Sequence, residues 1–131
     1  MREHMGEHSN IGVLNLKLLN DEFGNIQTDE VILMKERETH ILERHPGDYK
    51  CFMENKQQCI TNPDFIIKDT KNTGTLFMIK KLADTNLNIL LRLVLENDDP
   101  SFKNSIMTAY QLNDRKVIKL IDKHKLLYKK G

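Results

Sequence analysis

The chain has 131 residues, the length of one domain that can bury a core of its own. Its 20 Lys and Arg residues against 19 Asp and Glu give a net charge of +1, which neither indicates nor excludes a nucleic-acid partner. Two cysteines, taken to be reduced, and the lack of any apolar run near the roughly 18 residues of a membrane span predict a cytoplasmic protein without membrane contact.

The first part of the chain predicts a lead-in followed by two short strands. Residues 1–10 are polar and predict a flexible lead-in, so that a single α+β domain would span 11–131. Residues 11–19 are rich in strand formers and are followed at 20–25 by turn formers. The short apolar run 31–34 predicts a second strand, and a helix is expected to begin close behind it.

The end of that helix carries the most informative residues of the chain. His40, Arg44 and His45 crowd its last turn, and Pro46 then ends it. A histidine at a helix C-terminus lies at the negative end of the backbone dipole, a position that suits acid–base chemistry. His40 and Arg44 share one helix face, whereas two histidines five residues apart do not fit a helical metal site, so no metal is expected. The alternative is that all three are ordinary solvated residues.

The rest of the chain predicts a helix, a sheet and a closing helix. The first of these helices is expected over 48–60, with Asp48 as its cap and Pro63 shortly after its end. Asp114 is expected to cap the closing helix. Four extended runs separated by turn formers predict an antiparallel sheet, at residues 65–68, 75–81, 87–95 and 105–111. The expected fold is α+β, with N-terminal helices followed by an antiparallel sheet of about four strands and a C-terminal helix.

Basic side chains in the second half are candidates for binding phosphate. Residues 115–130 form a basic segment that includes Arg115 and Lys116, and such segments dock on phosphates, although a solvated helix face is the commoner explanation. Arg92 interrupts an apolar run and can bind a phosphate through two hydrogen bonds. Lys80 is a weaker candidate, because a charge on the surface of the sheet is the commoner explanation for it.

Three motifs, taken in order, resemble a known nuclease family. They are His-Ile-Leu-Glu-Arg-His-Pro at 40–46, Ile-Thr-Asn-Pro-Asp-Phe-Ile-Ile-Lys-Asp at 60–69 and Ile-Met-Thr-Ala-Tyr at 106–110. Their order and spacing resemble the phage-associated branch of the barnase–EndoU–colicin–RelE-like nucleases, over about residues 31–130. The resemblance implies a small sheet with helices packed on it, a cleft for RNA, and a metal-independent, toxin-like endoribonuclease that needs no cofactor.

For single residues, the resemblance implies roles in RNA cleavage. His40 or His45 would act as general acid or base and Arg44 would hold the phosphate, while Thr108 and Tyr110 would donate hydrogen bonds or position the RNA backbone. RNA is the expected partner, and an antitoxin or immunity protein is a further one. Two other interpretations use the same fold: a non-catalytic module that binds RNA or protein through its basic C-terminal helix, and a structural phage component or regulator.

Overall fold

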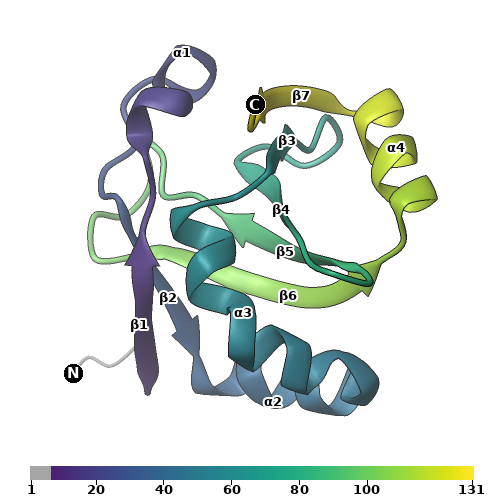
Figure 1. The fold of residues 1–131 in the computed structure, drawn as a ribbon. Coiled ribbons are helices and arrows are strands. Elements are labelled where there is room, and N and C mark those ends of the chain that lie inside the picture. Colours follow the sequence, from purple (N-terminus) through teal and green to yellow (C-terminus); the bar gives the residue numbers. More distant parts are fainter. Residues whose placement is uncertain (1–6) are drawn as a thin grey trace.

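A seven-stranded mixed sheet forms the centre of the fold (Figure 1). A computed structural model describes residues 7–131. The strand order is β1-β2-β6-β5-β4-β3-β7, in which β2 and β6 are parallel and every other neighbouring pair is antiparallel. The strands are β1 (His8–Val13), β2 (Glu30–Met34), β3 (Phe65–Lys68), β4 (Thr75–Lys81), β5 (Asn86–Arg92), β6 (Asn104–Leu112) and β7 (Lys125–Lys129). The helices are α1 (Asn20–Phe23), α2 (Lys35–Arg44), α3 (Tyr49–Thr61) and α4 (Asp114–Lys123), with 3-10 turns η1 (Leu16–Leu18) and η2 (Pro46–Asp48).

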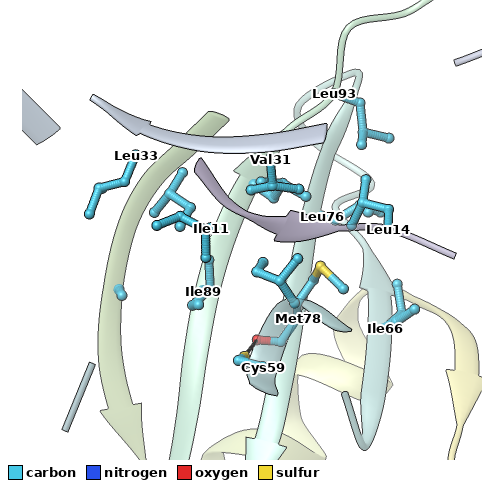
Figure 2. Close-up of a cluster of buried hydrophobic side chains, with 14 of the residues drawn as sticks. Ile11, Leu14, Val31, Leu33, Cys59, Ile66, Leu76, Met78, Ile89 and Leu93 are labelled. Atoms are coloured by element: carbon cyan, nitrogen blue, oxygen red, sulfur yellow. Dashed lines mark hydrogen bonds between the residues drawn. The ribbon is translucent and has the colours of Figure 1, made fainter. Parts of the chain in front are cut away.

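The larger core lies on the face of the sheet that α3 and the N-terminal segment cover. Its members come from the strands, from α3 and from the turn before α1, and Figure 2 shows part of the cluster around Met78 and Ile89. The Cys59 thiol of α3 donates a hydrogen bond to the Met78 carbonyl oxygen at 3.2 Å. Full burial raises the pKa of this thiol far above its ordinary value. Cys59 is therefore a packing residue of the core and not a nucleophile.

The opposite face of the sheet carries a smaller core beneath α4. Val117 of α4 joins Ile67 of β3 and Phe77 of β4 in this cluster. The helix covers the face incompletely, and on β5 and β6 the side chains of Leu90 and Tyr110 remain partly exposed. This partly uncovered region is the place on the sheet where polar side chains gather.

The prediction of an antiparallel sheet of about four strands closed by a C-terminal helix is wrong. The four predicted runs form β3, β4, β5 and β6, but β1, β2 and β7 extend the sheet on both sides and the pattern is mixed, so only the α+β class holds. In the parallel pair of β2 and β6, Val31 lies opposite Asn104, and no local pattern reveals a pairing over that separation. After α4 the chain continues as β7, an edge strand. Its exposed Lys125 and Lys129 are typical of edge strands. In the sequence they continue the basic segment that begins in α4, so the strand was not distinguished from the helix.

The N-terminal strand begins earlier than the sequence predicts. β1 starts at His8 and pairs with β2, so residues 8–10 of the expected lead-in belong to the sheet. Residues 1–6 of that lead-in lie outside the described residues. The strand ends at Val13, and η1 follows it as a separate turn because the Asn15 side chain caps it.

Two predicted helix caps also differ. Asp48 precedes α3 but makes no capping hydrogen bond, and its carboxylate accepts one from the Gln111 side chain of β6 at 2.9 Å. Asn113, and not Asp114, caps α4 by accepting the N–H of Lys116 at 2.9 Å. Both aspartates thus connect a helix start to the sheet, since Asp114 accepts from an asparagine of β5.

Candidate functional site

α2 lies beside β6 because β2 leads directly into it. β2 pairs with β6 through Val31 and Ile32, and the chain then enters α2 at Lys35. β2 pairs only with the start of β6, and α2 contacts the part of β6 that follows, beside which no strand lies on that edge among the described residues. The C-terminal end of α2 is thereby carried towards the second half of β6.

A bulge in β6 provides a contact point for the helix. The register between β5 and β6 shifts between Leu90 and Leu91, and Met107 of β6 is left without a partner on β5. The Met107 carbonyl oxygen accepts a hydrogen bond from Nη1 of Arg37 at 3.4 Å. Bulges are common next to active sites because they re-aim the side chains that follow them.

His45 is held in a fixed position at the end of α2. It is the C-cap of the helix, with φ −134° and ψ 56°. Its N–H donates to the Ile41 carbonyl at 2.8 Å, and its own carbonyl accepts the N–H of Asp48 at 2.9 Å. Its ring lies against that of Tyr110, with 5.2 Å between the centroids and a tilt of 42°. Both side chains are partly exposed, so an imidazole and a phenol meet at the surface of the sheet.

Beneath this pair lie polar atoms that no described residue satisfies. Asn88 of β5 faces Tyr110 across the ladder and is fully buried, yet its Oδ1 and Nδ2 have no hydrogen-bond partner among residues 7–131. The buried Thr108 hydroxyl is in the same situation. Burial raises the pKa of Tyr110, and the nearby Asn88 amide counteracts this in part. Since buried polar groups are almost always paired, these three atoms are where an ordered water, or a bound group that displaces it, would gain hydrogen bonds.

Arg92 and Ser105 lie opposite each other at the far end of the same face. Arg92 is exposed and extends over Gly74, where an added Cβ would come within 3.3 Å of its Nε. Gly74 has φ +77°, a conformation that favours glycine, so the turn between β3 and β4 leaves this space to the guanidinium. A positive side chain and a hydroxyl therefore continue the polar face away from Tyr110.

Of the residues predicted to be catalytic, the structure brings His45, Thr108 and Tyr110 to one region. His40 and Arg44 lie on α2 at three and seven residues from Arg37, hence on the same side of the helix. Because Arg37 reaches β6, this side of the helix is turned towards the strand. His40 is partly exposed and Arg44 is exposed.

The predicted phosphate-binding residues are scattered. Arg92 shares the sheet face of Tyr110, as described above. Lys80 does not, because it alternates with Ile79 of the smaller core and its Nζ is engaged by the Asn62 carbonyl oxygen at 2.9 Å. Arg115 and Lys116 are exposed in the first turn of α4.

Arg37 and Asn88 belong to this region but are absent from the sequence-based set of site residues. The spacing of Arg37 from His40 and Arg44 already places it on their side of the helix, which was a usable signal. Asn88 is a polar residue within the apolar strand that also holds Arg92. A polar residue at such a position is either a core amide with hydrogen-bond partners or part of a binding site, and only the hydrogen bonds of the folded structure distinguish the two.

His124 has a structural role at the other side of the sheet. It ends α4, and its ring packs against Phe77 at 5.0 Å between centroids. Its Nδ1 lies 3.1 Å from the backbone nitrogen of Thr70 and 3.6 Å from Oδ1 of Asp69. Asp69 is bound by the turn that follows it, through Asn72 and the backbone N–H groups.

Neither metal ligands nor membrane spans are found in the part of the chain that the structure describes. Across residues 7–131, no three His, Cys, Asp or Glu side chains gather as metal ligands would. No helix in the same range is long and apolar enough to cross a membrane. Comparison of the chain with protein-family models, with curated proteins and with solved structures gives no match. A function therefore has to be inferred from the site and from the motifs of the sequence.

Proposed function

We propose that the chain is a metal-independent endoribonuclease that cleaves RNA by general acid–base catalysis around His45 and Tyr110. The observation that carries the proposal is the contact between these two rings on a sheet face that α4 leaves partly open. The unpaired buried atoms of Asn88 and Thr108 next to them support a binding role for the same place. The motif resemblance supports RNA as the substrate.

The reaction requires three kinds of group, and the site can supply each of them. A general base takes the proton of a ribose 2′-hydroxyl, whose oxygen attacks the adjacent phosphorus. A general acid gives a proton to the 5′-oxygen as its bond to phosphorus breaks. The products are a 2′,3′-cyclic phosphate and a free 5′-hydroxyl. Positive groups and hydrogen-bond donors stabilise the extra negative charge in the transition state.

In this scheme His45 is one of the two proton-transfer groups and His40 is the candidate for the other. Arg44 and Arg37, on the same side of α2 as His40, bind the reacting phosphate. Tyr110 and Thr108 donate hydrogen bonds to its oxygens. The backbone of His45 is held at both its N–H and its carbonyl, and its ring contacts Tyr110, which limits the positions open to the imidazole.

The biological setting is proposed from the motif resemblance. We place the protein in the cytoplasm as a phage-associated or toxin-like nuclease, with an antitoxin or immunity protein as a regulatory partner. The exposed basic residues at the start of α4 favour a second candidate function, a non-catalytic RNA-binding module. In that case Arg115 and Lys116 would bind RNA phosphates and His45 would be dispensable.

The test compares wild type with three variants on total cellular RNA in the presence of EDTA, read on a denaturing gel. His45→Ala should lose at least about 100-fold in cleavage rate, within the range for a general acid–base group. Tyr110→Phe keeps the ring contact and tests the hydroxyl alone. His8→Ala, a histidine of the distant strand β1, serves as the matched control and should cleave as wild type does.

Three outcomes would count against the proposal. Intact RNA with wild-type protein, shown to be folded by circular dichroism, would favour the RNA-binding module. A folded His45→Ala protein with the wild-type rate would remove His45 from the reaction. Loss of cleavage in EDTA, restored by a divalent metal, would contradict the metal-independent mechanism.

A further inference from the structure

A cavity opens on the same sheet face, at the end of β5 and β6 away from Tyr110. Its volume is about 360 Å³, and Ile32, Met34, Arg92, Ser105 and Phe102 are among its lining residues. Ile32, Ser105 and Arg92 lie side by side on three adjacent strands and form its floor. The volume is within the range of sites that bind small molecules or single groups of a larger ligand.

The aromatic residue in this lining is unusually accessible. Phe102 is 48% exposed, although a phenylalanine in a folded domain usually contributes its ring to a core. Its backbone is fixed, since its N–H donates to the Asp99 carbonyl at 3.1 Å. An exposed aromatic ring in the lining of a cavity offers a planar base a surface on which to stack.

The positive groups around the cavity differ in whether they are already paired. Lys103 is bound to the Glu30 carboxylate at 2.9 Å. Arg92 makes no ion pair with any residue in the described part of the chain, and its guanidinium extends over the small Gly74. The lining also holds the carboxylates of Asp98 and Asp99, which accept the backbone N–H groups of Leu95 and Ser101. Arg92 is the lining cation that can bind a phosphate through two hydrogen bonds.

The cavity lies on the same strands and the same sheet face as the proposed active site. Ser105 of its floor is three residues before Thr108 on β6, about 10 Å at the rise of an extended strand. Tyr110 is five residues from Ser105, about 17 Å on the same strand. An RNA strand whose scissile phosphate lies at His45 and Tyr110 would thus place at the cavity a nucleotide beyond the immediately neighbouring one. We infer that the cavity is a nucleobase-binding subsite, in which a base stacks on Phe102 and Arg92 binds the adjacent phosphate; this inference rests on the proposed function.

The test measures binding without cleavage. Short fluorescein-labelled RNA with 2′-O-methyl groups cannot supply the attacking hydroxyl, so its dissociation constant is obtained by fluorescence anisotropy whether or not the protein is an enzyme. Phe102→Ala should weaken binding about 5- to 150-fold, the range for loss of one base–aromatic stack, and Phe102→Tyr should retain it. Arg92→Ala should weaken binding and lower the slope of log affinity against log salt by about one. Val13→Ala, at a similarly exposed apolar residue of β1, is the matched control.

The outcomes separate the two proposals. If unmodified RNA stays intact but Phe102→Ala and Arg92→Ala weaken binding, the subsite stands and the nuclease function is wrong. If wild type cleaves RNA and both variants bind as wild type does, the subsite is wrong and the nuclease function stands. A loss of affinity equal in Val13→Ala and Phe102→Ala would also overturn the subsite, as would undetectable binding by wild type.

Discussion

Two asparagines of β5 should respond in opposite ways to the same substitution. Asn86 and Asn88 are two residues apart on the same face, and both are buried, at 2% and 0% exposure. The Asn86 amide donates to the Leu112 carbonyl at 3.0 Å and to the Asp114 carboxylate at 2.9 Å. The Asn88 amide has no partner among the described residues. Val is slightly larger than Asn and is favoured in strands. Comparing the stabilities of the two Asn→Val variants therefore shows whether each amide has hydrogen-bond partners in the folded protein.

The structure sets the sign and the size of both effects. In Asn88→Val, two polar atoms that fold without partners disappear, so the free energy of unfolding should rise by about 1–3 kcal/mol. For a domain of this size that corresponds to an increase of roughly 3–10 °C in Tm. In Asn86→Val, a buried carbonyl and a carboxylate lose their donor, and the free energy of unfolding should fall by about 1–3 kcal/mol. RNA cleavage by Asn88→Val should nevertheless drop at least about tenfold, because the amide that a substrate would pair is gone.

The assay is urea denaturation followed by circular dichroism, with the slope m checked for constancy among the three proteins. Destabilisation of Asn88→Val to the same extent as Asn86→Val would refute the reasoning. It would mean that the Asn88 amide is hydrogen-bonded in the free protein, for example to ordered water, and is not reserved for a ligand. Stabilisation with undiminished cleavage would separate Asn88 from the reaction while leaving the energetic argument intact.

Three further substitutions test other parts of the fold. The pKa of Tyr110 is raised in the folded protein, so its phenol ionises at lower pH in the unfolded chain. The free energy of unfolding should therefore fall as the pH rises past about 10. Urea midpoints measured from about pH 8 to 11 should vary less with pH in Tyr110→Phe than in wild type. Burial raises the pKa of Asp69, but the hydrogen bonds from the Asn72 side chain and two backbone N–H groups lower it more. The ionised carboxylate therefore stabilises the folded protein above pH 3.8, its ordinary pKa, and this contribution should be lost at lower pH. In an acid titration, Asp69→Asn should lose less free energy of unfolding than wild type. In Gly12→Ala the new Cβ would lie 2.9 Å from Cγ2 of Thr61, and the free energy of unfolding from urea titration should fall by about 1–3 kcal/mol.

Local patterns predicted the middle of the chain well. The expected runs 65–68 and 75–81 match β3 and β4, since apolar residues flanked by turn formers specify both a strand and its ends. The helix was predicted to stop at Pro46, and α2 ends at Arg44 with His45 as its C-cap. What local patterns lack is information on which segments pair. The parallel contact of β2 with β6 and the attachment of β7 at the edge depend on packing between distant parts of the chain.

The same limit applies to the candidate site. The proximity of His45 to Tyr110 follows from α2 lying beside β6, which in turn follows from the β2–β6 pairing. The sequence motifs supplied the residue types. The basic residues chosen as phosphate-binding candidates, however, included Lys80, whose side chain binds the Asn62 carbonyl oxygen on the other face of the sheet. Asn88 could not be assigned from sequence, because a buried amide looks the same whether or not it has partners.

The two faces of the sheet contribute differently to stability, and this explains how the fold tolerates buried polar groups without partners. The larger core, with α3 and the N-terminal segment, buries most of the apolar side chains and supplies most of the hydrophobic stabilisation. The other face is only partly covered by α4, so leaving Asn88 and Thr108 without partners costs a few kcal/mol that the first face can offset. Improving the packing of the open face should therefore stabilise the protein while filling the space that a substrate needs. Stability and binding are expected to oppose each other on this face, and to be independent on the other.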